Sequence, residues 1–184
     1  MLEFLQNADK TLFLFINHLP HNVFLDTVFS FFSQIGQWGI IWFIIAVVIF
    51  HVEKYKDREG FFALLLACVI SFVFVEIGLK LLFGRLRPEF NILDTIVIFD
   101  RTTSPAFPSG HTTVAFAAAY ILSKKKIRWR FLFYLLATLI AFSRIYLGKH
   151  YPSDVLGGIL IGLLIGEISW RITKHLKLSR SSTR

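Results

Sequence analysis

Two side chains near the C-terminal third of the chain have the types and spacing of a nucleophile and the group that orients it. His150 and Asp154 are four residues apart, so they can meet if Asp154 lies in the first turn of a helix that His150 precedes. A carboxylate on one ring nitrogen fixes the tautomer and raises the basicity of the other nitrogen. His150 is therefore a candidate nucleophile toward phosphorus, and Asp154 would orient it.

A second histidine lies in the stretch Pro-Ser-Gly-His at residues 108–111, which opens a long uncharged apolar run. Proline is favoured at the first position of a helix, so we expect a helix to begin at Pro108. The free N–H groups at such a start form an anion site. His111 lies at this site and can transfer a proton near neutral pH, which makes it a candidate general acid.

Three cations stand at the ends of apolar runs on the same predicted face: Lys80, Arg87 and Arg144. Each alone could extend toward the membrane surface or bind a lipid headgroup. Together with the histidines they supply the positive charge that stabilises the oxygens of a transferred phosphoryl group. No set of His, Asp and Glu has the spacing of an open metal site, so the sequence predicts no metal ligands.

Membrane helices must position these groups. The chain has 184 residues, of which 55% are hydrophobic, and the apolar residues are concentrated in runs. About 20 apolar residues form a helix that crosses the hydrocarbon core. We therefore expect an all-α, polytopic bundle of five transmembrane helices in a single domain over residues 1–184. The expected spans are residues 27 or 37 to 50, 60–83, 108–123, 130–147 and 152–172.

Residues 1–34 admit two interpretations. The apolar stretch at residues 12–19 is short, and Pro20 with several polar residues interrupts the segment after it. The favoured interpretation is an N-terminal interfacial segment of two short helices hinged at Pro20. The alternative is a sixth transmembrane helix with a polar break, which would move the N-terminus to the inner side.

The net charge of +8 comes from basic residues between and after the apolar runs, which is typical of cytoplasmic loops rather than of a nucleic-acid-binding surface. These residues cluster at 54–58, at 124–130 and in the tail after Arg171, and five spans would place all three clusters on one side. The positive-inside rule makes that side cytoplasmic, including a tail at residues 175–184. The candidate site would then face the periplasm or the exterior of an inner or plasma membrane. We expect no nucleic-acid partner.

Three motifs in order resemble the signature of the type 2 phosphatidic acid phosphatase superfamily. They are Lys80-x6-Arg87-Pro88, Pro108-Ser109-Gly110-His111 and Ser143-Arg144-x5-His150-x3-Asp154. The resemblance implies a membrane lipid phosphatase that forms a phosphohistidine without a metal or other cofactor. It implies that His150 is the nucleophile, Asp154 its orienting group and His111 the general acid. The phosphate would be bound by Lys80, Arg87, Ser109, Gly110 and Arg144.

The expected substrate is a membrane lipid phosphate. The stretches at residues 16–26, 108–113 and 142–152 resemble bacterial undecaprenyl-pyrophosphate phosphatases of the bacitracin-resistance type, which implies conversion of undecaprenyl pyrophosphate to undecaprenyl phosphate. Lys80 and Gly110 depart from some of those enzymes and lean toward phosphatidylglycerophosphate or lipid A phosphatases. Phosphatidic acid is a further alternative. A lipid phosphotransferase and an anion transporter are alternatives of other classes. The sequence predicts no particular oligomeric state.

Three weaker features have structural interpretations. Glu76 lies one helical turn before Lys80, and we favour a structural ion pair over a catalytic role. Arg85 is interpreted as an ordinary loop charge, with recruitment of anionic headgroups as the alternative. Glycines recur along the last span, where they favour close helix packing; they are Gly157, Gly158, Gly162 and Gly166.

Overall fold

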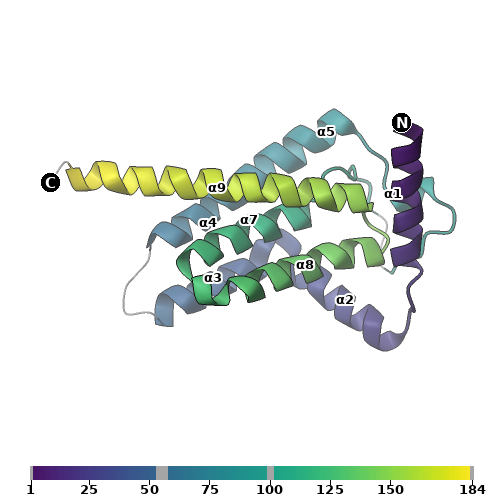
Figure 1. Cartoon of the computed structure of the whole chain (residues 1–184), viewed down its shortest axis with the longest axis horizontal. Coiled ribbons are helices and arrows are strands. Elements are labelled where there is room, and N and C mark those ends of the chain that lie inside the picture. The colour runs from purple at the N-terminus through teal and green to yellow at the C-terminus, as the bar shows by residue number, and fades with distance from the viewer. Residues whose placement is uncertain (1, 53–57, 99–101, 183–184) are drawn as a thin grey trace.

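The computed structural model describes residues 2–52, 58–98 and 102–182, and within these ranges every regular element is helical. This confirms the all-α prediction. Figure 1 shows long helices side by side along the bundle, with one helix across its end. The elements are α1 (Leu2–Asn17), α2 (Val23–Ile35), η1 (Gln37–Gly39), α3 (Ile40–Val52), α4 (Arg58–Ser71), η2 (Phe72–Leu79), α5 (Lys80–Phe83), α6 (Pro88–Asn91), α7 (Gly110–Lys125), η3 (Ile127–Trp129), α8 (Arg130–Tyr146) and α9 (Pro152–Ser182).

Three helical stretches of the described chain are long and apolar enough to cross a membrane: Glu59–Asn91, Ile127–Tyr146 and Pro152–Leu176. A fourth is possible if Val23–Ile35 and Ile40–Val48 form one span, which is bent by 72° at its break. The predicted number of five or six is therefore not confirmed. The expected span at residues 108–123 is not among these stretches, because the 16 residues of α7 reach only about 24 Å at 1.5 Å per residue.

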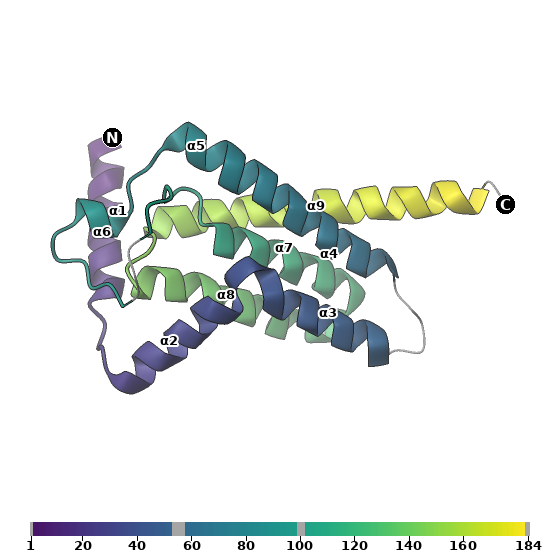
Figure 2. The same cartoon turned by 180° about the vertical axis from the view of Figure 1, so that it is seen from behind.

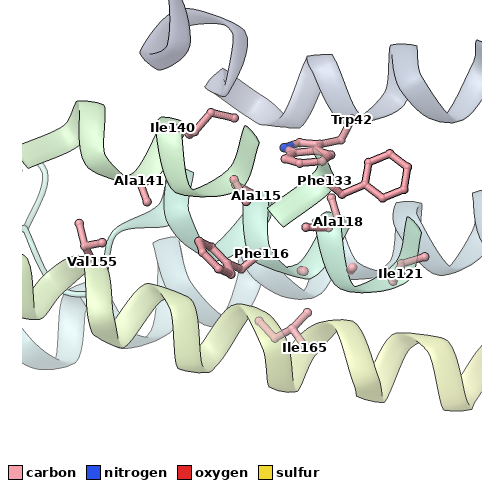
Figure 3. Packing of buried hydrophobic residues seen from close by; sticks show 14 of the residues in the cluster. Trp42, Ala115, Phe116, Ala118, Ile121, Phe133, Ile140, Ala141, Val155 and Ile165 are labelled. Atoms are coloured by element: carbon pink, nitrogen blue, oxygen red, sulfur yellow. The ribbon is translucent and has the colours of Figure 1, made fainter. Parts of the chain in front are cut away.

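The short α7 is the central helix of the bundle. Its side chains are buried over most of its length, unlike those of the surrounding helices, which expose many large apolar residues. Figure 3 shows its small residues between the larger side chains of its neighbours. Those neighbours include Trp42 of α3, Phe133 and Ile140 of α8, and Val155 and Ile165 of α9. The helix is thus held by protein on several sides.

Glycines let α9 approach α7 closely. A Cβ on Gly158 would lie 2.8 Å from the carbonyl oxygen of Ser109, and one on Gly162 would lie 2.5 Å from that of Thr113. Both distances are too short for a side chain, so close approach requires glycine, as the sequence predicts. The contact fixes the start of α7 beside the start of α9, and both helix starts carry candidate site residues.

The N-terminal helix lies across the end of the bundle, at a steep angle to α8 and α9 (Figures 1 and 2). Asn17 anchors its C-terminal end, because its Nδ2 donates to the carbonyl oxygens of Ile96 and Tyr146, each at 2.9 Å. The next helix, α2, runs back along α8 and leads into α3. The two helices on either side of Pro20 thus differ in orientation, and α2 belongs to the bent pair instead of lying beside α1. An interfacial location for residues 1–34 stays a prediction.

Part of the predicted cytoplasmic charge lies outside the described residues, namely Lys54, Lys56 and Arg184. The basic residues at 124–130 lie at the opposite end of α7 and α8 from α1, and α9 runs on beyond that end (Figure 1). The basic end and the end crossed by α1 are thus well separated along the bundle.

Candidate active site

A cavity of about 1000 Å³ brings most of the predicted site residues together. It is lined by the two histidines, the three cations and the glycine of the second motif: Lys80, Arg87, Gly110, His111, Arg144 and His150. These residues come from three motifs that are far apart in the chain, so only the folded bundle joins them. Ser109 and Asp154 do not line the cavity, and both are fully buried behind it.

His150 lies in a tight turn between α8 and α9. Gly148 takes the left-handed conformation at φ +76°, and the N–H groups of Lys149 and His150 both donate to the carbonyl oxygen of Arg144. The imidazole is 1% exposed. Its Nε2 lies 3.4 Å from Nη1 of Arg87, and its Nδ1 lies 3.6 Å from Oδ2 of Asp154. The second distance is longer than a hydrogen bond, and such contacts often tighten only when substrate binds.

Asp154 lies in the first turn of α9, as the sequence predicts, and other groups hold its carboxylate. Its Oδ2 accepts the N–H of Tyr151 at 2.8 Å, and its Oδ1 accepts Nη1 of Arg85 at 2.6 Å. The interpretation of Arg85 as an ordinary loop charge is therefore wrong. Its partner is distant in sequence, so local spacing gave no signal for the pair.

The two cavity arginines donate to uncharged partners. Arg87 donates through Nε to the carbonyl oxygen of Ser104 at 2.7 Å and through Nη2 to the hydroxyl of Ser104 at 2.9 Å. Arg144, which is also buried, donates to the hydroxyl of Ser33. A buried cation without a carboxylate partner is costly unless an anion binds it. The pair is thus well suited to a phosphate group.

Lys80 is paired with a carboxylate. Its Nζ lies 2.7 Å from Oε2 of Glu76, which confirms the structural ion pair. Glu76 belongs to the π-helical turn η2, a rare geometry that often marks functional sites. A Cβ on Gly110 would collide with Oε1 of Glu76, so the glycine leaves room for this carboxylate beside the start of α7.

The start of α7 differs from the prediction. The helix begins at Gly110 with Ser109 as N-cap, not at Pro108, and the N–H of Ser109 donates to the carbonyl oxygen of Asp154 at 3.1 Å. The Ser109 hydroxyl contacts that of Thr112 at 3.0 Å. Binding of phosphate by Ser109 therefore stays a prediction without support from its side chain. His111, by contrast, lines the cavity.

Sequence reasoning missed Lys149, which also lines the cavity. Its Nζ lies 3.0 Å from Oε2 of Glu89, and both side chains are almost fully buried. Its position next to His150 was the available signal. In the described ranges, no three His, Cys, Asp or Glu side chains come together as a possible metal site. A reaction without metal stays a prediction.

The charges around His150 should appear in the pH dependence of the reaction. Burial and the nearby charges of Arg87, Arg144 and Lys80 hold the pKa of His150 well below its ordinary value, against the opposing effect of a hydrogen bond to the backbone of Ala106. The imidazole thus stays unprotonated in mild acid, and kcat/KM should fall only as the pH drops through this lowered pKa.

Replacing Arg87 by glutamine removes a positive charge 3.4 Å from the ring and should raise that pKa. The acidic limb of the kcat/KM profile should then move to higher pH relative to the unmodified protein. Arg128→Gln, at an exposed position, is the control and should leave the limb in place. A limb that stays fixed in Arg87→Gln would contradict this electrostatic account.

The fold and the site together define a class. A helical bundle with apolar outer faces, holding a histidine–carboxylate pair among buried cations, is an integral-membrane enzyme of phosphoryl transfer. Residues 60–177 match the PAP2 superfamily. The chain belongs to this superfamily, and it is a multi-pass membrane lipid phosphatase.

Named relatives and solved structures agree with this assignment. The chain is 32% identical to the lipid A 4'-phosphatase of Bacteroides thetaiotaomicron, over 96% of this chain and 81% of that protein. It is 28% identical to undecaprenyl-diphosphatase BcrC of Bacillus subtilis, over 85% and 79%. Among solved structures, LpxE of Aquifex aeolicus is similar with a TM-score of 0.72 and 34% identity, over 88% of this chain and 93% of that one. A PAP2-type phosphatidylglycerolphosphate phosphatase of Bacillus subtilis has a TM-score of 0.71 and 25% identity, over 93% and 87%.

Proposed function

We propose that this phosphatase hydrolyses its lipid phosphate through a phosphohistidine on His150. One observation carries the proposal: His150 and His111 line the same cationic cavity, and Asp154 lies behind the His150 ring on the side of Nδ1. The guanidinium of Arg87 lies near Nε2 of His150. A phosphate that Nε2 attacks would lie there, and its negative charge would need stabilisation at this position.

The proposed reaction has two displacements at phosphorus. Nε2 of His150 attacks, the bond between phosphorus and the lipid oxygen breaks, and His111 gives its proton to that oxygen. Asp154 accepts the Nδ1 proton in a hydrogen bond and stabilises the charged ring. Water then attacks the phosphohistidine and gives a proton to His111, the P–N bond breaks, and inorganic phosphate leaves. Both histidines return to their starting states.

The first candidate substrate is undecaprenyl pyrophosphate, which the sequence predicts. Support comes from the relatives of this chain that are named undecaprenyl-diphosphatase, including those of Bacillus subtilis and Sulfolobus acidocaldarius. The relatives named lipid A 4'-phosphatase and the structural similarity to a phosphatidylglycerolphosphate phosphatase support a second candidate, a lipid phosphate monoester.

The charge balance of the cavity favours the monoester. Both cavity lysines are paired with glutamates, whereas Arg87 and Arg144 donate to uncharged groups, so about two positive charges remain for the substrate. A phosphate monoester carries close to two negative charges at neutral pH. A lipid pyrophosphate carries more, and beyond the two arginines only the protonated His111 of the described cavity lining would balance the excess.

A panel of substrates tests both the reaction and the choice. Purified protein in detergent is assayed for phosphate release from lipid A, phosphatidylglycerophosphate, phosphatidic acid and undecaprenyl pyrophosphate. We expect at least one monoester to exceed the pyrophosphate in kcat/KM by about tenfold, the effect of ~1.4 kcal/mol in the transition state. The opposite order would assign undecaprenyl pyrophosphate. Failure to release phosphate from any lipid would overturn the proposed function. Transfer of phosphate to an added alcohol would identify a phosphotransferase.

We also propose that the site opens on the outer side of an inner or plasma membrane, with the C-terminus in the cytoplasm. The support is the separation of charge along the bundle. The basic residues at 124–130 lie at the end remote from the cavity cations, and such residues accumulate on the cytoplasmic side.

A further inference from the structure

A cluster of polar side chains joins the N-terminal helix to the carboxylate behind His150. Arg85 bridges two carboxylates: its Nη2 donates to Oδ2 of Asp9 and its Nη1 to Oδ1 of Asp154, each at 2.6 Å. Ser153 lies between them. Its N–H donates to Oδ1 of Asp9 at 2.9 Å, and its hydroxyl donates to Oδ2 of Asp9 at 2.5 Å. Asp9 thus both caps the start of α9 and holds Arg85.

This arrangement determines how the Asp154 carboxylate can turn. Its Oδ1 is held by Arg85 and its Oδ2 by the N–H of Tyr151, which leaves Oδ2 as the oxygen that faces Nδ1 of His150. Arg85 is in turn fixed by three further contacts: the carboxylate of Asp9, the hydroxyl of Ser153, to which its Nη1 donates at 2.6 Å, and the ring of Tyr151, whose centroid lies 4.1 Å from the guanidinium carbon. Because the planar guanidinium of Arg85 is held on several sides, it fixes the orientation of the Asp154 carboxylate that it contacts.

The charges matter as well as the geometry. Asp9 is 11% exposed and Asp154 fully buried, so neither carboxylate is well screened by solvent. While both are ionised, they share the single positive charge of Arg85. Without the charge of Asp9, Arg85 would pair with Asp154 alone and would neutralise more of its negative charge. The Asp154 carboxylate would then stabilise the positive charge that develops on His150 less effectively.

We propose that Asp9 of the N-terminal helix is a positioning residue for the reaction, acting on Asp154 through Arg85. The inference rests on the proposed function, because it assigns Asp9 to the orientation of the same nucleophile. It gives α1 a role beyond covering the end of the bundle. Asp9 does not line the cavity, so substrate binding should not depend on it directly.

The main test is Asp9→Asn, which keeps the shape and the acceptor oxygen but removes the charge. We expect kcat for phosphate release from the best substrate of the panel to fall about tenfold, with KM within twofold of the unmodified protein. Glu3→Gln, an exposed neutralisation on the same helix, is the matched control and should change neither constant.

A double-mutant cycle distinguishes positioning from general structural damage. In an Asp154→Asn background, Asp9→Asn should cost less than a further twofold in single-turnover phosphate release, because the carboxylate on which it acts is already gone. If the two losses multiply, Asp9 acts independently of Asp154 and the inference is wrong. Arg85→Lys keeps the charge but loses the two-pronged contact. Arg85→Lys should also lower kcat about tenfold, and it serves as the test if Asp9→Asn does not yield folded protein.

The His150→Ala variant distinguishes a failure of the proposed mechanism from a failure of the role assigned to Asp9. Full activity in His150→Ala would remove the proposed mechanism itself. An inactive His150→Ala together with an Asp9→Asn that matches the unmodified protein would remove only the role of Asp9.

Discussion

Replacing His150 by alanine should lower phosphate release by at least about a thousandfold while the protein still folds and inserts. The expected loss is large because the side chain forms the bond to phosphorus, and His150 is the one histidine of the described cavity lining that has a carboxylate beside its ring. Folding should survive because the turn that holds His150 is built from backbone hydrogen bonds to Arg144 and a left-handed glycine.

The covalent intermediate gives this prediction a second, independent measurement. Labelled lipid phosphate mixed with the unmodified protein and quenched in alkali should leave label on the chain, because a P–N bond is stable to alkali and labile to acid. The His150→Ala variant should carry none. His18→Ala, at an exposed position, is the matched control and should retain both label and turnover. Turnover in His150→Ala within tenfold of the unmodified protein would exclude His150 as the nucleophile.

Replacing His111 by glutamine should slow formation of the phosphoenzyme from a lipid substrate by about 10²–10⁴-fold, the usual contribution of a general acid. Glutamine is of similar length and can still hydrogen-bond in the cavity, but it cannot give up a proton. The measurement is single-turnover formation of labelled enzyme, which isolates the first displacement from the later attack of water.

The leaving group provides the control for this role. An aryl phosphate with a weakly basic leaving oxygen needs little protonation, so His111→Gln should cost it less than about tenfold in the same step. Equal losses for the lipid and the aryl phosphate would show that His111 binds phosphate instead of donating a proton.

The sequence predicted much of the site because part of the chemistry is local. His150 and Asp154 lie within one turn of each other, and the helix start between them determines that they meet. Glu76 and Lys80 also meet through local spacing, because they are four residues apart in one continuous helical stretch. Most of the site residues predicted from the three motifs line one cavity, although the motifs are far apart in the chain.

Other features of the site depend on packing, and the sequence had no means to show them. Arg85 meets Asp9 and Asp154 across 76 and 69 residues, because α1 lies across the end of α9. Ser109 does not line the cavity, and its N–H donates to the carbonyl oxygen of Asp154. In each case the partner is supplied by another helix, so the outcome depends on how the helices are placed against each other.

For the membrane helices too, part of the outcome follows from the sequence and part from the packing. Hydropathy determined the class, because a run of apolar residues must be buried in lipid or protein wherever it lies. It could not tell these two environments apart, and so hydropathy did not show that α7, one of the predicted spans, is the buried centre of the bundle. The sequence by itself thus determined an all-helical membrane phosphatase with its reactive groups in three local motifs. The tertiary structure decided which helix is enclosed by the others, which charges pair, and which carboxylate of the N-terminal helix reaches the site, because these depend on contacts between segments remote in the chain.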